Sequence, residues 1–357
     1  MKKRENGLDL LRCIAAFGVV LAHVLSPYKH YYEPLAKAGA FVPNAASWIV
    51  AFLRMQNWAV PAFFMMSGAY ILGSARTTDF KSFYKKTWKR LGIPTLIWTG
   101  VYLVVCTVYY WLYYGVDFST AVILELGQTA LGTPAAHLWY MFALIGMYLA
   151  APFLALGKEK LTKRGWMWAS LVVYVWGTVT AILQPFTYYW GMNTIGNLLG
   201  VFMMGNVIHE GIGEKKSKAL GGLCIAGGLG CMVLLTLLYH KGVLEGQLPD
   251  WVVQVFADLK PFGPLITIGG GLFFAGFRLL DIQKDFSKWG GRTFDVYLVH
   301  GVFLMVFSLI EKLIGLPDAW FGQMTCLVEI IINAALVYVL SFAASALLEK
   351  WRAARSH

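Results

Sequence analysis

The sequence predicts an all-α integral membrane protein, a polytopic bundle of about ten transmembrane helices with both termini in the cytoplasm. Hydrophobic residues make up 58% of the 357 residues and charged residues only 14%, against roughly 25% charged residues in soluble domains. The apolar residues fall into stretches of about 20, the length that crosses a bilayer as a helix. Loops rich in Lys and Arg alternate with loops that contain few of them.

Each apolar stretch is expected to be helical, because lipid offers no hydrogen-bond partner to backbone N–H and C=O groups. The chain reads as a single transmembrane domain, 1–357, without an internal repeat or a fused soluble domain. The ten expected spans are 8–27, 57–74, 91–113, 137–156, 165–184, 192–210, 219–239, 262–279, 293–313 and 323–348.

The first stretch follows the basic sequence MKKR and could pass for a secretory signal peptide. It contains Arg12 and His23, and it lacks a small-x-small cleavage site. We therefore interpret it as a retained first helix.

The basic loops predict the orientation of the bundle. Lys and Arg close to the ends of spans mark the cytoplasmic side of a membrane protein. Every second loop is basic, so these loops form one side, and both termini belong to it. The basic residues are Lys2, Lys3 and Arg4, then Arg76, Lys81, Lys85, Lys86, Lys89 and Arg90, then Lys158, Lys160, Lys163 and Arg164, then Lys215, Lys216 and Lys218, then Arg278, Lys284, Lys288 and Arg292, and finally Lys350, Arg352 and Arg355.

The opposite loops are rich in aromatic residues, which allows two interpretations. Trp and Tyr gather where a helix leaves the bilayer, so a belt at the membrane interface is the first. A surface on which sugar rings stack is the second. The residues are Tyr28, Tyr31 and Tyr32, then Tyr109, Tyr110, Trp111, Tyr113 and Tyr114, and then Tyr188, Tyr189 and Trp190.

Three other patterns do not indicate a further function. The net charge of +11 lies in short loops between spans, where orientation and lipid head groups explain it better than nucleic acid does. The five cysteines lie in apolar stretches with no zinc-site spacing, so no metal is expected. The glycines of 221–230 and 269–276 lie inside apolar spans with no preceding strand, so close helix packing explains them better than a nucleotide loop.

The first span carries the residues with most chemical meaning. Arg12 and His23 are eleven residues apart, close to three full helical turns, so both side chains face the same way about 16 Å apart along the axis. Ionisable groups within a span usually face the bundle interior or a wet cavity. Each residue could also have a purely structural role: Arg12 could snorkel to the lipid head groups, and His23 could be a hydrogen-bonded histidine of the core. Asp9, one turn before Arg12, is placed to pair with it.

Four further segments follow this pair along the chain. They are PAFFMMSG from Pro61 to Gly68, FYKKTWKRLGIP from Phe83 to Pro94, HLWY from His137 to Tyr140 with Tyr148 and Pro152 beyond it, and GRTFDVYLVH from Gly291 to His300. Together with Arg, ten residues and His in the first span, they resemble the acyltransferase family 3 integral membrane proteins over nearly the whole chain. Many members have Arg-x-x-Arg in the basic loop. Here Thr87 stands at its first place and Arg90 at its second, and Lys86 or Lys89 could replace the missing charge.

The resemblance implies transfer of an acyl group, usually acetyl, from cytoplasmic acyl-coenzyme A. It implies an acceptor hydroxyl on an extracytoplasmic glycan or a lipid-linked saccharide, in the cell membrane of a bacterium. An alcohol needs a base with a pKa near 7, and a histidine such as His23 is that kind of group. Arginine suits the phosphates of coenzyme A, because its planar group donates two parallel hydrogen bonds. We therefore expect His23 and Arg12 to be catalytic.

The remaining expected roles divide between donor and acceptor. Tyr297 and His300 in the ninth span line the donor channel or serve packing, and the basic loop binds the donor phosphates. His137, Trp139 and Tyr140 meet the acceptor at the outer mouth of the fourth span. Ser67 and Gly68 are read as a packing pair, not as a nucleophile. The residues expected to bind the donor are Arg12, Lys85, Lys86, Lys89, Arg90, Tyr297 and His300.

Two other functions fit a bundle of this kind. A secondary transporter would suit the ionisable residues in the first span and the glycine-interrupted helices, but the chain has no inverted repeat and few carboxylates within its spans. An accessory subunit of glycan export would use the fold without catalysis. Binding of acyl-coenzyme A distinguishes the enzyme from both.

Overall fold

The computed structural model describes residues 5–130, 135, 137–182, 192–256, 263–315 and 325–354, and every regular element in them is helical. The all-α prediction is confirmed. The main helices are α1 (Asn6–Val24), α2 (Ser26–Lys37), α3 (Ala45–Arg54), α4 (Ala59–Leu72), α5 (Phe80–Thr87), α6 (Ile93–Tyr109), α7 (Phe118–Ala130), α8 (Trp139–Lys160), α9 (Lys163–Ile182), α11 (Met192–Ile212), α12 (Lys218–Leu238), α13 (Asp250–Phe256), α14 (Pro264–Leu279), α15 (Ser287–Leu313) and α16 (Thr325–Ala354).

The described helices include seven runs that are long and apolar enough to cross a membrane, which supports a multi-pass membrane protein. The helix α14 is a shorter apolar helix, and α9 and α11 occupy the fifth and sixth predicted spans. The count of ten spans and the cytoplasmic termini stay predictions. The seven runs are Asn6–Val24, Ala45–Leu72, Phe80–Tyr114, Trp139–Lys160, Lys218–Leu244, Ser287–Leu313 and Leu327–Lys350.

Several runs are longer than the sequence predicted, because polar turns continue the apolar helix. The helix α5 joins α6 through a π-helical turn, Trp88–Gly92, so the predicted basic loop is itself helical. The side chain of Asp79 caps the start of α5 by accepting a hydrogen bond from the Ser82 N–H at 3.2 Å. The basic residues of this segment therefore project from a helix with a defined phase.

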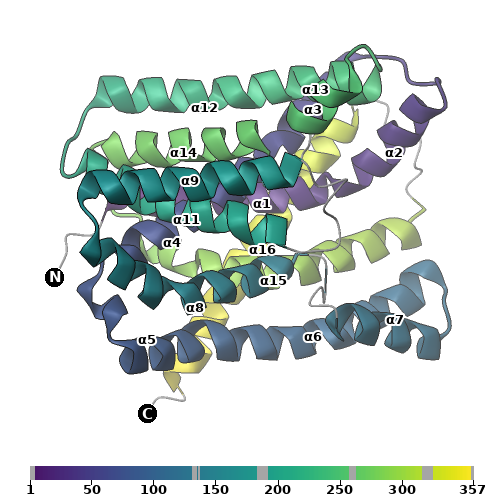
Figure 1. The fold of residues 1–357 in the computed structure, drawn as a ribbon. Helices are drawn as coiled ribbons and strands as arrows, with labels where there is room; N and C mark the ends of the chain where they lie inside the picture. The colour runs from purple at the N-terminus through teal and green to yellow at the C-terminus, as the bar shows by residue number, and fades with distance from the viewer. Residues whose placement is uncertain are drawn as a thin grey trace.

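The first helix lies at the centre of the bundle. In Figure 1, α1 runs between the layer of α9, α11 and α14 and the pair α15 and α16. It contacts α4, α14, α15 and α16. Its residues Leu8, Leu11 and Ala15 are fully buried. The stripe that carries Arg12 and His23 therefore faces other helices.

Close helix packing explains several of the glycines, as predicted, whereas a Cβ on Gly222 or Gly230 would meet no atom within 4 Å. A Cβ on Gly68 of α4 would lie 1.8 Å from the backbone oxygen of Phe202 on α11, so only glycine permits this approach. The helices α12 and α14 approach in the same way, since a Cβ on Gly276 would lie 3.0 Å from the Gly221 carbonyl oxygen. The interpretation of Gly68 as a packing residue is confirmed.

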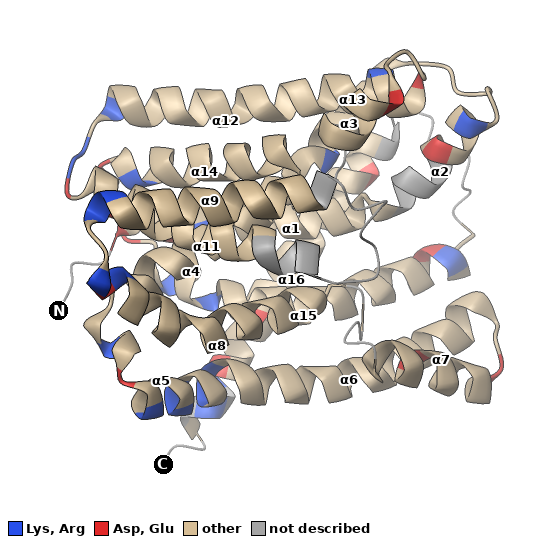
Figure 2. Ribbon diagram, in the orientation of Figure 1, with Lys and Arg blue, Asp and Glu red and all other residues tan. Residues whose placement is uncertain are grey.

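Charge is distributed unequally between the two ends of the bundle. Figure 2 shows most Lys and Arg at the end where α5 begins, where α8 meets α9 and where α12 begins. The start of α1 and the end of α16 lie at this same end (Figure 1). Several residues named from the sequence lie outside the described part, namely Lys2, Lys3, Arg4, Tyr188, Tyr189, Trp190 and Arg355, with the side chains of Tyr28, Tyr31 and Cys326.

Candidate active site

A cavity of about 830 Å³ lies between α1, α4, α5, α8 and α15. Its size falls within the range of about 300–1,000 Å³ that is usual for small-molecule sites. Arg12 and His23 both line it, as their spacing predicts. None of the described residues that line it is Asp or Glu. The polar and aromatic lining consists of Arg12, His23, Phe63, Ser67, Tyr70, Ser74, Arg76, Thr77, Phe83, Lys86, Thr87, Arg90, His137, Trp139, Tyr140, Tyr148, Thr293, Phe294 and Tyr297.

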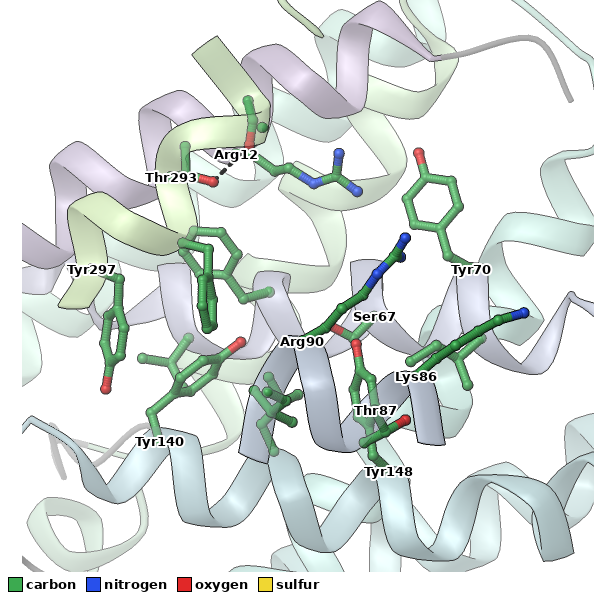
Figure 3. Close-up of a pocket in the computed structure, with 18 of the residues that line it drawn as sticks. Arg12, Ser67, Tyr70, Lys86, Thr87, Arg90, Tyr140, Tyr148, Thr293 and Tyr297 are labelled. Atoms are coloured by element: carbon green, nitrogen blue, oxygen red, sulfur yellow. Dashed lines mark hydrogen bonds between the residues drawn. The ribbon is translucent and has the colours of Figure 1, made fainter. Parts of the chain in front are cut away.

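One end of the cavity is cationic. Figure 3 shows the side chains of Arg12 and Arg90 pointing toward Tyr70, with Lys86 extending along the same side of the cavity away from the two guanidinium groups. The guanidinium of Arg12 lies 2.5 Å from the carboxylate of Asp9 and 5.1 Å from the centre of the Tyr70 ring. Asp9 is almost fully buried, and Arg12 keeps a quarter of its side-chain surface exposed. Asp9 thus fixes the arginine in place, as its position one turn earlier predicts.

The helical phase of α5 and of the π-helical turn Trp88–Gly92 selects which basic residues reach the cavity. Phe83, Lys86, Thr87 and Arg90 line it, and these residues recur at three- and four-residue steps on one face. Lys85 and Lys89, on the next face, do not line the cavity. Of the four basic residues expected near the donor, the structure therefore brings Lys86 and Arg90 to Arg12 and leaves Lys85 and Lys89 outside.

Three histidines from distant parts of the chain meet at the other end. The ring centre of His23, on α1, lies 5.3 Å from that of His300, on α15, and 6.1 Å from that of His137, just before α8. The rings of His137 and His300 are 4.9 Å apart. Nε2 of His137 and Nε2 of His300 have no hydrogen-bond partner among the described residues, so both nitrogens are free to bind a group that enters the cluster.

Tyr297 of α15 holds two of these histidines. Its hydroxyl donates a hydrogen bond to the backbone carbonyl of His137. Its own backbone carbonyl lies 2.6 Å from Nδ1 of His300. A carbonyl oxygen can only accept, so the proton of a neutral His300 is on Nδ1 and its lone pair is on Nε2. The turn of α15 from Tyr297 to His300 therefore fixes the backbone position of His137 and the ring orientation of His300.

A glycine makes room for His137. A Cβ on Gly301 would lie 2.5 Å from Cε1 of His137 and 2.7 Å from the hydroxyl of Tyr102. The Tyr102 ring, fully buried on α6, packs edge-on against His137 at 4.7 Å. The imidazole of His137 thus fits into a space that any larger residue at 301 would fill.

Two histidines lie deeper than the sequence suggested. His137 was expected at the outer mouth of the fourth span, but it is 6% exposed and adjoins His23. His300 was expected two turns into the ninth span. Because α15 already begins at Ser287, His300 is near the middle of the helix, fully buried, and it does not line the cavity. Trp139, Tyr140 and Tyr297 do line it.

One face of α4 and the turn after it contribute cavity residues for which the sequence predicted no such role: Ser67 was expected to pack and Arg76 only to mark the orientation. Phe63, Ser67 and Tyr70 line the cavity, followed by Ser74 and Arg76. The spacing of the first three follows helical period and could have revealed the stripe. Arg76 lies in a short 3₁₀ turn, Ala75–Thr78, whose direction the sequence pattern does not indicate.

Comparison with known proteins gives the family of this chain. The acyltransferase domain model of acyltransferase family 3 matches residues 5–350. Searches of curated proteins and of solved structures found no match. The matched region contains the whole cavity, from Arg12 to Tyr297. This chain therefore belongs to the acyltransferase 3 family of membrane proteins.

Proposed function

We propose that the protein transfers an acyl group, acetyl in the simplest case, from acyl-coenzyme A to a hydroxyl of a cell-envelope saccharide or lipid-linked glycan. The observation that carries the proposal is the single cavity that joins the cations Arg12 and Arg90 to His23. The donor has charged phosphates at one end and a reactive thioester at the other, as this cavity has cations at one end and imidazoles at the other.

The donor enters from the basic end in this proposal. Arg12, Lys86 and Arg90 bind its phosphates, and the slim pantetheine arm extends beside α1. The axial distance of about 16 Å between Arg12 and His23 separates the phosphates from the thioester. Coenzyme A is a cytoplasmic compound, so the basic end is the cytoplasmic end, in agreement with the orientation that the basic loops predict.

His23 removes the proton of the acceptor hydroxyl while the hydroxyl oxygen attacks the thioester carbonyl. The new C–O bond forms, the C–S bond breaks, and the thiolate of coenzyme A takes the proton back from His23. In the alternative route His23 attacks the thioester first and carries the acyl group before the hydroxyl receives it. Trp139 and Tyr140 offer aromatic surfaces for the acceptor's sugar ring next to His23.

Binding of acetyl-coenzyme A to the purified protein tests the donor site. Arg90→Ala should weaken binding ten- to hundredfold, because a charge-assisted contact contributes about 1.5–3 kcal/mol. The matched control is Lys89→Ala, which removes an adjacent cation that does not line the cavity and should bind as the unaltered protein does. Equal loss in the two variants would mean that only the general positive charge matters, and absence of binding in the unaltered protein would favour a transporter.

Substitution of His23 tests the chemistry separately from binding. His23→Ala should lose acyl transfer by about 10²–10⁴-fold and keep its affinity for acetyl-coenzyme A. Radioactive acetyl trapped on His23 in the absence of acceptor would select the covalent route. Normal modification of the envelope saccharide in cells that carry His23→Ala would contradict both routes.

A further inference from the structure

His300 occupies a layer behind the cavity. Its side chain is fully buried and does not line the cavity, and its ring adjoins those of His23 and His137, which do. The Nδ1–H donates to the Tyr297 carbonyl. His300 is therefore held by α15 and directed at two residues that can meet substrate.

The Nε2 atom of His300 has no hydrogen-bond partner among the described residues. A buried acceptor without a partner costs about 1–3 kcal/mol, and such atoms are rare in folded proteins. Since Nδ1 carries the proton, Nε2 offers a lone pair. It calls for a donor. The neighbouring imidazoles are those of His137, 4.9 Å away by ring centres, and His23, 5.3 Å away, and neither is hydrogen-bonded to this atom in the described structure.

A histidine that acts as a base or nucleophile needs a partner that fixes its tautomer. In most such sites a carboxylate accepts the N–H of one ring nitrogen and leaves the lone pair of the other facing the substrate. This cavity has no Asp or Glu among its described lining residues. Among the described lining residues, His23 therefore has no carboxylate partner, and the ring centre of His300 lies 5.3 Å from that of His23.

We infer that His300 is a positioning residue for His23. No hydrogen bond joins the two described rings, and a small rotation of the His23 ring as substrate binds brings its N–H to the unpartnered Nε2 of His300. The other ring nitrogen of His23 then faces the cavity. The inference rests on the proposed function and extends it. When His23 takes the proton of the acceptor hydroxyl, the resulting imidazolium donates to the same lone pair and is stabilised. His300 itself neither gains nor loses a proton during the cycle.

Two substitutions of similar size distinguish the role of Nδ1 from the role of Nε2 in His300. Asparagine has its amide near the position of Nδ1, so His300→Asn can keep the bond to Tyr297 but lacks the acceptor at Nε2. Glutamine places its amide oxygen near Nε2, so His300→Gln keeps the acceptor. Gel filtration and thermal unfolding establish that each variant folds.

The measurement is the release of free thiol from acetyl-coenzyme A by the purified protein, with water as the acceptor of the acetyl group, analysed as kcat and KM. His300→Asn should lower kcat by about 10–100-fold, the usual effect of losing a residue that orients a catalytic group, and leave KM for acetyl-coenzyme A unchanged. His300→Gln should restore most of the rate. A purely structural role of His300 would instead change stability and KM together.

The outcomes separate the inference from the function on which it rests. Full activity of His300→Asn in an active protein would overturn the inference and leave the proposed function intact. Equal loss in the folded Asn and Gln variants would also overturn it, because His300 would then transfer the proton itself. If the unaltered protein neither binds nor consumes acetyl-coenzyme A, the proposed function fails and the inference fails with it.

Discussion

Glu125 is an acidic residue enclosed where charge is costly. It lies on α7, which is not among the described candidate spans, and its side chain is fully buried against Cys106 and the backbone of Ala135. Burial raises the pKa of its carboxyl group from 4.5 to about 7. The Ala135 carbonyl accepts a hydrogen bond from the Leu138 N–H, so Glu125 packs close to the backbone that carries His137.

The raised pKa predicts how stability depends on pH. Between pH 4.5 and about 7 the folded protein holds a proton on Glu125 that the unfolded chain has lost, so the free energy of unfolding falls as pH rises through this window. Glu125→Gln mimics the protonated form and should unfold at a higher temperature than the unaltered protein at pH 8, with little difference at pH 4.5. The same difference in Tm at both pH values would contradict the assignment.

A hydrogen-bonded chain between α3 and the π-helical segment Tyr239–Leu244 has the atom order of a serine-hydrolase triad. The hydroxyl of Ser47 lies 3.0 Å from Nε2 of His240, and Nδ1 of His240 lies 2.7 Å from the carboxylate of Glu245. Ser47 is 1% exposed and also completes the capping box of α3 with Asn44. The His240 ring stacks on Trp48 at 3.6 Å. Because Ser47 is buried, we interpret the hydrogen bonds from Ser47 through His240 to Glu245 as a structural link between α3 and the π-helical segment.

If this link is structural, breaking it at Ser47 should reduce stability and leave activity unchanged. Ser47→Ala should lower the free energy of unfolding by about 1–3 kcal/mol, because His240 loses a buried partner. Acetyl-coenzyme A consumption at 25 °C should stay normal, and a fluorophosphonate probe should not label Ser47. The control Ser26→Ala, at an exposed position, should change neither property. Labelling of Ser47 would show instead that substrate reaches it.

Helical period accounts for the part of the site that the sequence could predict. It places Arg12 and His23 on one stripe. It could also have separated Lys86 and Arg90 from Lys85 and Lys89 along α5 and the π-helical turn that follows it. The meeting of His137 and His300 with His23 could not be predicted in this way. It depends on how α6, α8 and α15 pack, on the space at Gly301, and on a start of α15 earlier than the apolar pattern indicates.

The whole molecule has one basic end, and the sequence predicted that end to face the cytoplasm. The run Phe80–Tyr114 carries the chain from this end to the start of α7. In a variant without native cysteines, a thiol placed at Lys81 should resist a membrane-impermeant reagent added outside cells, and one placed at Thr120 should react. Both positions are exposed on the protein. Reaction at 81 and protection at 120 would reverse the proposed direction of transfer.

The separation of cations from histidines along the cavity has an electrical consequence. Moving one elementary charge across 100 mV involves about 2.3 kcal/mol, so a reaction that carried the donor's phosphates through the membrane would depend strongly on voltage. In the proposed mode of binding, Arg12, Lys86 and Arg90, which line the cavity, keep those phosphates at one end, and only the uncharged thioester arm reaches His23. The acyl group would then cross the membrane without any movement of net charge. We expect its transfer to proceed equally fast in energised and de-energised membranes.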